Sequence, residues 1–138
     1  MRIEERRNRG ISLIELLVVM AIIAMFLTLV GSRVFRNVEK SKQVVAKNQI
    51  HEFETVLDMF RLDVGRYPTT QEGLQALQVK PAGADNWDGP YMKKDVPLDP
   101  WNRPYVYRCP GQRADFDLIA LGADGQEGGE GDNRDITN

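Results

Sequence analysis

Residues 10–30 read GISLIELLVVMAIIAMFLTLV, an apolar run whose single acidic residue is Glu15. Between residues 16 and 30 only Thr28 is polar. A membrane-spanning helix needs about 20 apolar residues, and this run supplies them. Because a carboxylate in hydrocarbon costs roughly 2.5–3.5 kcal/mol even on lenient insertion scales, Glu15 is expected to have a partner and a function.

The residues before this run are basic, whereas the rest of the chain is acidic. The first ten residues hold four arginines and two glutamates, yet the whole chain of 138 residues has a formal net charge of −2. Since lysines and arginines are scattered after residue 10, we expect no nucleic-acid partner. The length leaves room for one domain plus an anchor, and the single cysteine, Cys109, excludes an internal disulfide.

No residue pattern in the chain is typical of an enzyme. The single histidine, His51, falls on the polar side of a predicted helix, and the serines lie in or near the apolar run. The sequence has no credible nucleophile–base pair, no C-x-x-C and no nucleotide-binding motif. We therefore expect no enzymatic activity.

Three interpretations of residues 1–32 compete. A secretory signal peptide fits the basic start, but the apolar stretch is long and residues 31–32 form a poor cleavage site. A plain signal anchor fits the length but leaves Glu15 unexplained. A type IV prepilin signal, cut after Gly10, keeps the anchor attached and leaves the basic leader in the cytoplasm. Gly10, Ile11 and Glu15 stand at the positions that this signal requires.

A single long helix is predicted to follow from this run. No proline precedes Pro68, and apolar residues recur at helical spacing after Arg33, so we predict a helix over residues 11–62, about 78 Å long. Its first half is apolar on all sides and belongs in a membrane or bundle, whereas its amphipathic second half packs on a domain. Residues 31–32 are its only expected weak point. The apolar stripe continues through Val34, Val38 and Val45 and is followed by Ile50, Phe53, Leu57 and Phe60.

The second half of the chain predicts a small α+β domain. Thr69 and Glu72 have capping-box spacing, so a short helix is expected to run to about Val79 with Leu74 and Leu77 facing inward. Downstream, residues 105–108 and 116–121 are predicted to be two strands joined across a Pro-Gly turn. The fold class is therefore α+β: a long N-terminal helix packed on a small domain with a short helix and an antiparallel sheet.

Two turn segments each contain a tryptophan. Trp87 and Trp101 lie among Gly, Pro, Asn and Asp residues, which favour turns. We interpret both segments as loops folded back on the core, the alternative being a sugar-binding cleft. Cys109, beside the turn between the strands, is interpreted as a small unreactive filler.

The last segment is dense in carboxylates and glycines. Residues 122–135 contain five carboxylates, five glycines and one arginine. Such carboxylates repel one another unless a hard cation joins them, and an oxygen-rich set without sulfur or imidazole favours calcium over zinc. An EF-hand does not fit, because Gln126 and Gly128 occupy two ligand positions. A disordered acidic tail is the alternative from composition alone.

Three motifs in order resemble one family. Residues 66–74 (RYPTTQEGL), 99–105 (DPWNRPY) and the loop 122–136 look like the general secretion pathway protein G family, the major pseudopilins of type II secretion. The N-terminal segment resembles the wider type IV filament superfamily, which usually has Phe and Thr where this chain has Ile11 and Ser12. The resemblance covers nearly the whole chain from Gly10 and implies a pilin-like fold.

The resemblance also implies a processing pathway and a division of the chain. It implies cleavage between Gly10 and Ile11, N-methylation of Ile11, and pairing of Glu15 with the N-terminal amine of a neighbouring subunit. Residues 1–10 would be a leader peptide and 11–32 the transmembrane and filament-core helix. Residues 33–138 would be a periplasmic domain with a calcium loop at 121–136.

Calcium is the cofactor that the resemblance implies, bound by the final loop. Asp124 and Asp132 are the first candidates for side-chain ligands, followed by Glu130 and Asp135. Carbonyl oxygens of two further residues complete the expected set, those of Leu121 and Gln126.

The implied function is that of a structural filament subunit whose pseudopilus drives the export of folded proteins. It would sit in the bacterial inner membrane as a single-pass protein. The implied partners are copies of itself, minor pseudopilins, the inner-membrane assembly platform, a prepilin peptidase and the membrane. The alternatives are a type IV pilin, a membrane-tethered periplasmic binding protein that uses the Trp87 and Trp101 loops, and a tethered hydrolase.

Overall fold

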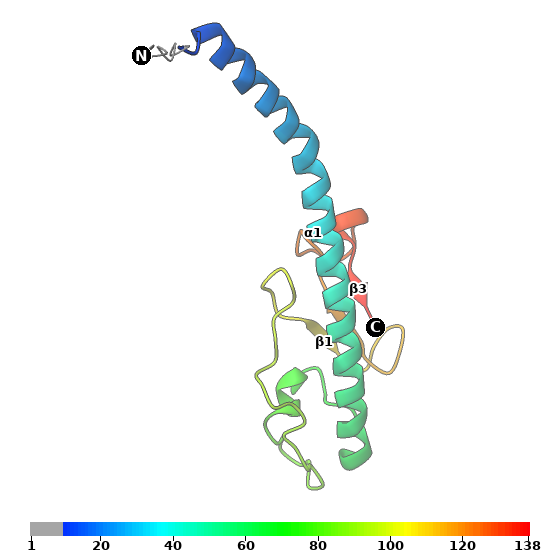
Figure 1. Cartoon of the computed structure of the whole chain (residues 1–138). Coiled ribbons are helices and arrows are strands. Elements are labelled where there is room, and N and C mark those ends of the chain that lie inside the picture. The colour runs from blue at the N-terminus through cyan, green and yellow to red at the C-terminus, as the bar shows by residue number, and fades with distance from the viewer. Residues whose placement is uncertain (1–9) are drawn as a thin grey trace, which may run out of the picture. The chain divides into compact units, whose positions relative to one another are not determined.

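The structure, a computed structural model, describes residues 10–138 (Figure 1). The predicted leader therefore lies outside the described residues except for Gly10. The elements follow in the order α1 (Leu13–Val64), η1 (Gly73–Leu77), β1 (Val106–Arg108), β2 (Asp117–Ala120), η2 (Gly131–Asn133) and β3 (Ile136–Thr137). The chain divides into two compact units, and the division along the sequence falls between Asn37 and Val38.

The N-terminal unit consists of the first half of α1. The single long helix that the sequence predicts is confirmed, and helical structure continues through residues 31–32, the expected weak point. Its apolar side chains lie exposed, from Leu13 (81 % exposed) to Val30 (56 %). Among residues 10–138, α1 is the one helix that is long and apolar enough to cross a membrane.

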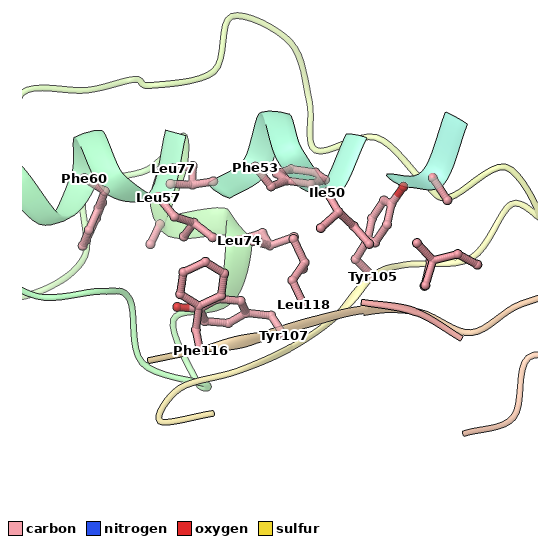
Figure 2. Close-up of a cluster of buried hydrophobic side chains, with 14 residues drawn as sticks. Ile50, Phe53, Leu57, Phe60, Leu74, Leu77, Tyr105, Tyr107, Phe116 and Leu118 are labelled. Carbon is pink, nitrogen blue, oxygen red and sulfur yellow. The ribbon is translucent and has the colours of Figure 1, made fainter. Parts of the chain in front are cut away.

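The C-terminal unit is built around the inner face of the second half of α1. Figure 2 shows this face against η1 and the sheet, with aromatic and leucine side chains between them. Phe53 meets Tyr105 edge to face, with ring centroids 5.2 Å apart. The later part of the predicted apolar stripe is buried, namely Ile50, Phe53, Leu57 and Phe60. The earlier part is exposed, because it lies beyond the packed core: Val34, Val38 and Val45.

The sheet is antiparallel, in the order β1-β2-β3. The predicted pair of strands is confirmed, with Tyr107 opposite Leu118. β3 was not predicted, because its two residues follow the glycine-rich loop and are too few to show an alternating pattern. Ala120 lies opposite Ile136, so the acidic loop connects two neighbouring strands.

The short second element differs from its prediction. The capping box forms, since Glu72 Oε2 accepts the Thr69 N–H at 2.7 Å and Thr69 Oγ1 accepts the Glu72 N–H at 3.2 Å. Leu74 and Leu77 are buried as expected. However, the element is the 3-10 helix η1 and ends at Leu77, not near Val79. The φ of Gly73, the first residue of η1, is +59°, a left-handed conformation that glycine adopts without steric cost.

Candidate functional site

Ser12 fixes the start of α1. Its Oγ accepts the Glu15 N–H at 3.2 Å, and its carbonyl accepts the Leu16 N–H at 3.1 Å, so Ser12 is the N-cap. Gly10 and Ile11 therefore lie outside the helix, and Ile11 is 76 % exposed. The sequence signal was the spacing of Ser12 and Glu15, which is that of a capping box. The threonine that the superfamily usually has at this position could cap the helix in the same way. The change to Ser12 therefore preserves the N-cap.

Glu15 lies in the first turn of α1, with its carboxylate exposed among apolar neighbours. A negative charge in the first turn is favoured by the helix dipole. Thus the N-cap places the Gly10–Ile11 peptide bond in exposed, non-helical backbone and Glu15 one turn beyond it. Exposed, irregular backbone of this kind is where proteases cut most readily.

The acidic loop at the other end of the chain begins against an arginine. Arg103 donates from Nη1 to the carbonyls of Leu121 (3.3 Å) and Gly122 (3.0 Å), and from Nη2 to the carbonyl of Ala123 (3.1 Å). Asp99 in turn fixes the backbone of Arg103, since its Oδ1 accepts the Arg103 N–H at 2.8 Å. Sequence reasoning missed Arg103, although it lies within one of the recognised motifs.

Inside the loop, two carboxylates bind backbone amides. Asp124 Oδ1 accepts the Gln126 N–H at 3.0 Å, and Asp135 Oδ2 accepts the Gly128 N–H at 2.8 Å. The other oxygen of Asp135, Oδ1, is buried and has no hydrogen-bond partner. A buried carboxylate oxygen without a partner is unfavourable, so Asp135 marks a place where a cation or water is needed.

The predicted calcium ligands come from both halves of the loop but are not assembled around one point. Asp124, Glu130 and Asp132 have exposed side chains, and within residues 10–138 no three Asp, Glu, His or Cys side chains converge as a metal site. The loop is nevertheless drawn together across its width, because the Ala123 N–H donates to the Asp132 carbonyl at 3.1 Å. The available donors are oxygens, which fits calcium in chemistry.

The loop is also tied to α1. Gln43 Nε2 donates to the carbonyl of Gly131 at 2.9 Å, across the middle of the loop. Four residues earlier on α1, Glu39 accepts the indole N–H of Trp101 at 2.8 Å. Together with Lys42, this hydrogen bond from Trp101 lowers the pKa of Glu39. The acidic loop and the DPWNRPY segment therefore share the same stretch of helix.

Both tryptophan loops fold back on the core, as predicted. Trp87 and Trp101 pack against the hydrophobic cluster, and Trp87 Nε1 donates to the Ala76 carbonyl at 2.9 Å. Because each indole N–H is engaged within the chain, neither is directed at a ligand. His51, as predicted, is exposed on α1, with Nδ1 3.2 Å from Glu54.

The fold and the N-terminal geometry define a pilin-like class of protein: an exposed apolar helix, started by a cap just after a glycine, joined to a small α+β domain. Residues 33–138 match the family model described as type II secretion system (T2SS) protein G, and residues 6–31 match the prokaryotic N-terminal methylation motif. The chain therefore belongs to the type II secretion system protein G family.

Named relatives extend over almost the full chain. It is 42 % identical to the type II secretion system core protein G of Pseudomonas aeruginosa, covering 98 % of this chain and 97 % of that protein. The corresponding protein of Vibrio cholerae is 42 % identical, with 96 % and 92 % covered.

A solved structure agrees with these relatives. The crystal structure of the major pseudopilin from the type 2 secretion system of enterohaemorrhagic Escherichia coli is 38 % identical to this chain. It superposes with a TM-score of 0.64 over 74 % of this chain and 90 % of that one. The predicted fold class is thus confirmed, and so is the predicted function, that of a structural major pseudopilin of type II secretion. A type IV pilin and a tethered binding protein are not favoured.

Proposed function

We propose that this pseudopilin is cut between Gly10 and Ile11, N-methylated on Ile11, and held in the inner membrane by residues 11–32. Residues 33–138 then lie in the periplasm, since a basic leader stays on the cytoplasmic side. The observation that carries this proposal is the N-cap at Ser12, which leaves the Gly10–Ile11 bond exposed before a helix of exposed apolar residues.

Intact-mass measurement and N-terminal sequencing of the protein from bacterial inner membranes test this proposal. We expect a chain that begins at Ile11 and carries one extra methyl group. A chain that begins at Met1, or one cut near Ser32, would contradict it, because Glu15 would then have no mature N-terminal amine to meet. A Gly10→Val variant serves as the control and is expected to keep the leader.

The chemistry of this subunit is assembly, not catalysis. Glu15 pairs with the N-terminal amine of a neighbouring copy, because two opposite charges buried together are less unfavourable than either alone. Growth of the helical filament then pushes folded substrates outward as a piston or screw. The partners are further copies of this chain, minor pseudopilins, the inner-membrane assembly platform and the prepilin peptidase. The energy comes from an ATPase elsewhere.

We also propose that the acidic loop binds calcium, which would neutralise its carboxylates. Asp124, Asp132, Glu130 and Asp135 supply side-chain oxygens, and Leu121 and Gln126 supply carbonyls. The supporting observation is the buried Oδ1 of Asp135, which lacks a partner. The charge of calcium would compensate that oxygen and draw the two halves of the loop together.

A further inference from the structure

Arg103 already brings a positive charge to the beginning of the acidic loop. Its guanidinium contacts three successive carbonyls, of residues 121–123, at 3.0–3.3 Å. A guanidinium stays protonated at any physiological pH, and its planar set of donors suits several acceptors at once. The loop therefore has a permanent cationic partner supplied by its own chain.

This contact occupies an oxygen that calcium would use. The Leu121 carbonyl accepts the Gly125 N–H at 3.0 Å in addition to the Arg103 guanidinium at 3.3 Å. A carbonyl oxygen has two lone pairs, so both acceptor positions of Leu121 are taken. Calcium can bind this oxygen only after one of the two donors has left.

The loop backbone at Gly125 passes close to the Arg103 guanidinium. A Cβ added to Gly125 would lie 2.6 Å from Cζ and Nη1 of Arg103, nearer than such atoms approach one another. The φ of Gly125 is +70°, so this position also needs glycine for its backbone. Glycine thus allows the loop to pass directly over the guanidinium.

The backbone of Arg103 is also held in place. Asp99 is 3 % exposed, and its Oδ1 accepts the N–H groups of Trp101 (2.9 Å) and Arg103 (2.8 Å). Asn102 between them has a φ of +63°, which closes the turn. The backbone of Arg103 is therefore held by a turn outside the acidic loop, and its guanidinium reaches from there to the loop carbonyls.

We propose that Arg103 is a built-in clamp that holds the acidic loop in the absence of calcium and competes with calcium for the Leu121 carbonyl. The loop then has two arrangements, one held by the guanidinium and one held by the ion. The competition rests on the calcium binding proposed above, whereas the clamp does not.

The clamp is tested by hydrogen exchange on the full chain in detergent micelles with a chelator present. We expect Arg103→Gln to speed exchange of the Ala123 and Gly125 amides about tenfold, since charged hydrogen bonds that hold the loop are lost. Arg103→Lys, which keeps the charge but not the planar fork, is expected to be intermediate. Arg113→Gln, at an exposed arginine, is the matched control. Unchanged exchange in folded Arg103→Gln would overturn the clamp.

Calorimetric titration of the same proteins with calcium chloride tests the competition. We expect Arg103→Gln to bind calcium several-fold more tightly than the wild type, because the Leu121 carbonyl is then available. Equal or weaker binding would overturn the competition and would mean that the arginine prepares the loop for the ion. If no variant binds calcium while exchange still accelerates, the clamp stands and the proposed calcium function fails.

Discussion

At the scale of single residues, Arg66 and Glu72 form the best-defined ion pair of the domain. The guanidinium donates to both carboxylate oxygens, at 2.7 and 2.8 Å. These hydrogen bonds, with the Thr69 N–H, lower the pKa of Glu72 from its ordinary value of 4.5 to about 2. Because Glu72 also closes the capping box before η1, the pair joins the end of α1 to the next element.

The lowered pKa of Glu72 predicts an acid-dependent stability. A carboxylate whose pKa is lower in the folded state stabilises above its unfolded pKa, and this contribution is lost as the pH falls toward about 2. At pH 7 we expect Glu72→Gln to lower the free energy of unfolding by about 1–2 kcal/mol, a figure discounted because Arg66 is 41 % exposed.

Urea unfolding at several pH values, followed by tryptophan fluorescence, measures this effect. The difference between wild type and Glu72→Gln should shrink between about pH 4.5 and pH 2. Glu52→Gln, at an exposed glutamate on α1, is the control. A difference that stays constant down to pH 2 would argue against the ion pair as its cause.

A second prediction at the residue scale concerns the proposed calcium ligands. Asp124→Ala is expected to lower the melting temperature by about 5 °C or more in calcium, because stabilisation by a bound ion is lost. In chelator the two proteins should melt almost together. Asp95→Ala, at an exposed aspartate outside the loop, should melt like the wild type in both. Equal melting of wild type and Asp124→Ala in calcium would rule out Asp124 as a ligand.

At the scale of elements, α1 presents one buried face and one exposed face within the C-terminal unit. Leu57 is fully buried in the core of the domain, whereas Leu62, little more than a turn later on the same helix, is 83 % exposed. The two residues are thus a matched pair on one helix, with the same side chain in opposite environments.

We expect Leu57→Ala to lower the free energy of unfolding by about 2–5 kcal/mol, because it removes apolar contacts and leaves a cavity. Leu62→Ala should change it by less than about 0.5 kcal/mol, since an exposed leucine loses little on truncation. Urea midpoints of the two variants give the comparison. Similar losses in both would mean that α1 does not pack with the face seen in Figure 2.

The elements also show what the sequence could and could not predict. The burial of Leu57 and Leu118 was predictable, because local periodicity places Leu57 on the inner face of a helix and Leu118 on the inner face of a strand. β3 was not, since two residues carry no period and pair only through the closed loop. Arg103 was missed for a related reason: its partners at residues 121–123 are distant in sequence, and no local pattern records such contacts.

At the scale of the whole molecule, the apolar half of α1 presents its side chains at the surface of the described part of the chain. Leu13 to Val30 are exposed, whereas one face of the amphipathic half is covered by the domain. The membrane and neighbouring subunits are the environments that this surface fits in a pseudopilin. Glu15 is the one acidic residue placed in it.

We expect Glu15→Ala to leave membrane insertion intact and to block filament growth, because insertion depends on the apolar run, whereas growth depends on the charge pair that we propose for Glu15. Thr28→Ala is the control, since Thr28 Oγ1 donates to the Ala24 carbonyl of its own helix, at 2.9 Å. Membrane fractionation and electron microscopy of filaments give the two readouts. Normal filaments from Glu15→Ala would make Glu15 a tolerated interfacial charge.

The pairing of β3 with β2 has a kinetic consequence. Residues 121–135 form a closed loop whenever Ala120 meets Ile136, and closing a loop of this size lowers the entropy of the chain before any strand contact is gained. Unless the loop is held, the last strand is therefore the part of the sheet that detaches most readily. In a subunit waiting for assembly, the proposed arginine or calcium contact would then set how often this C-terminal edge opens.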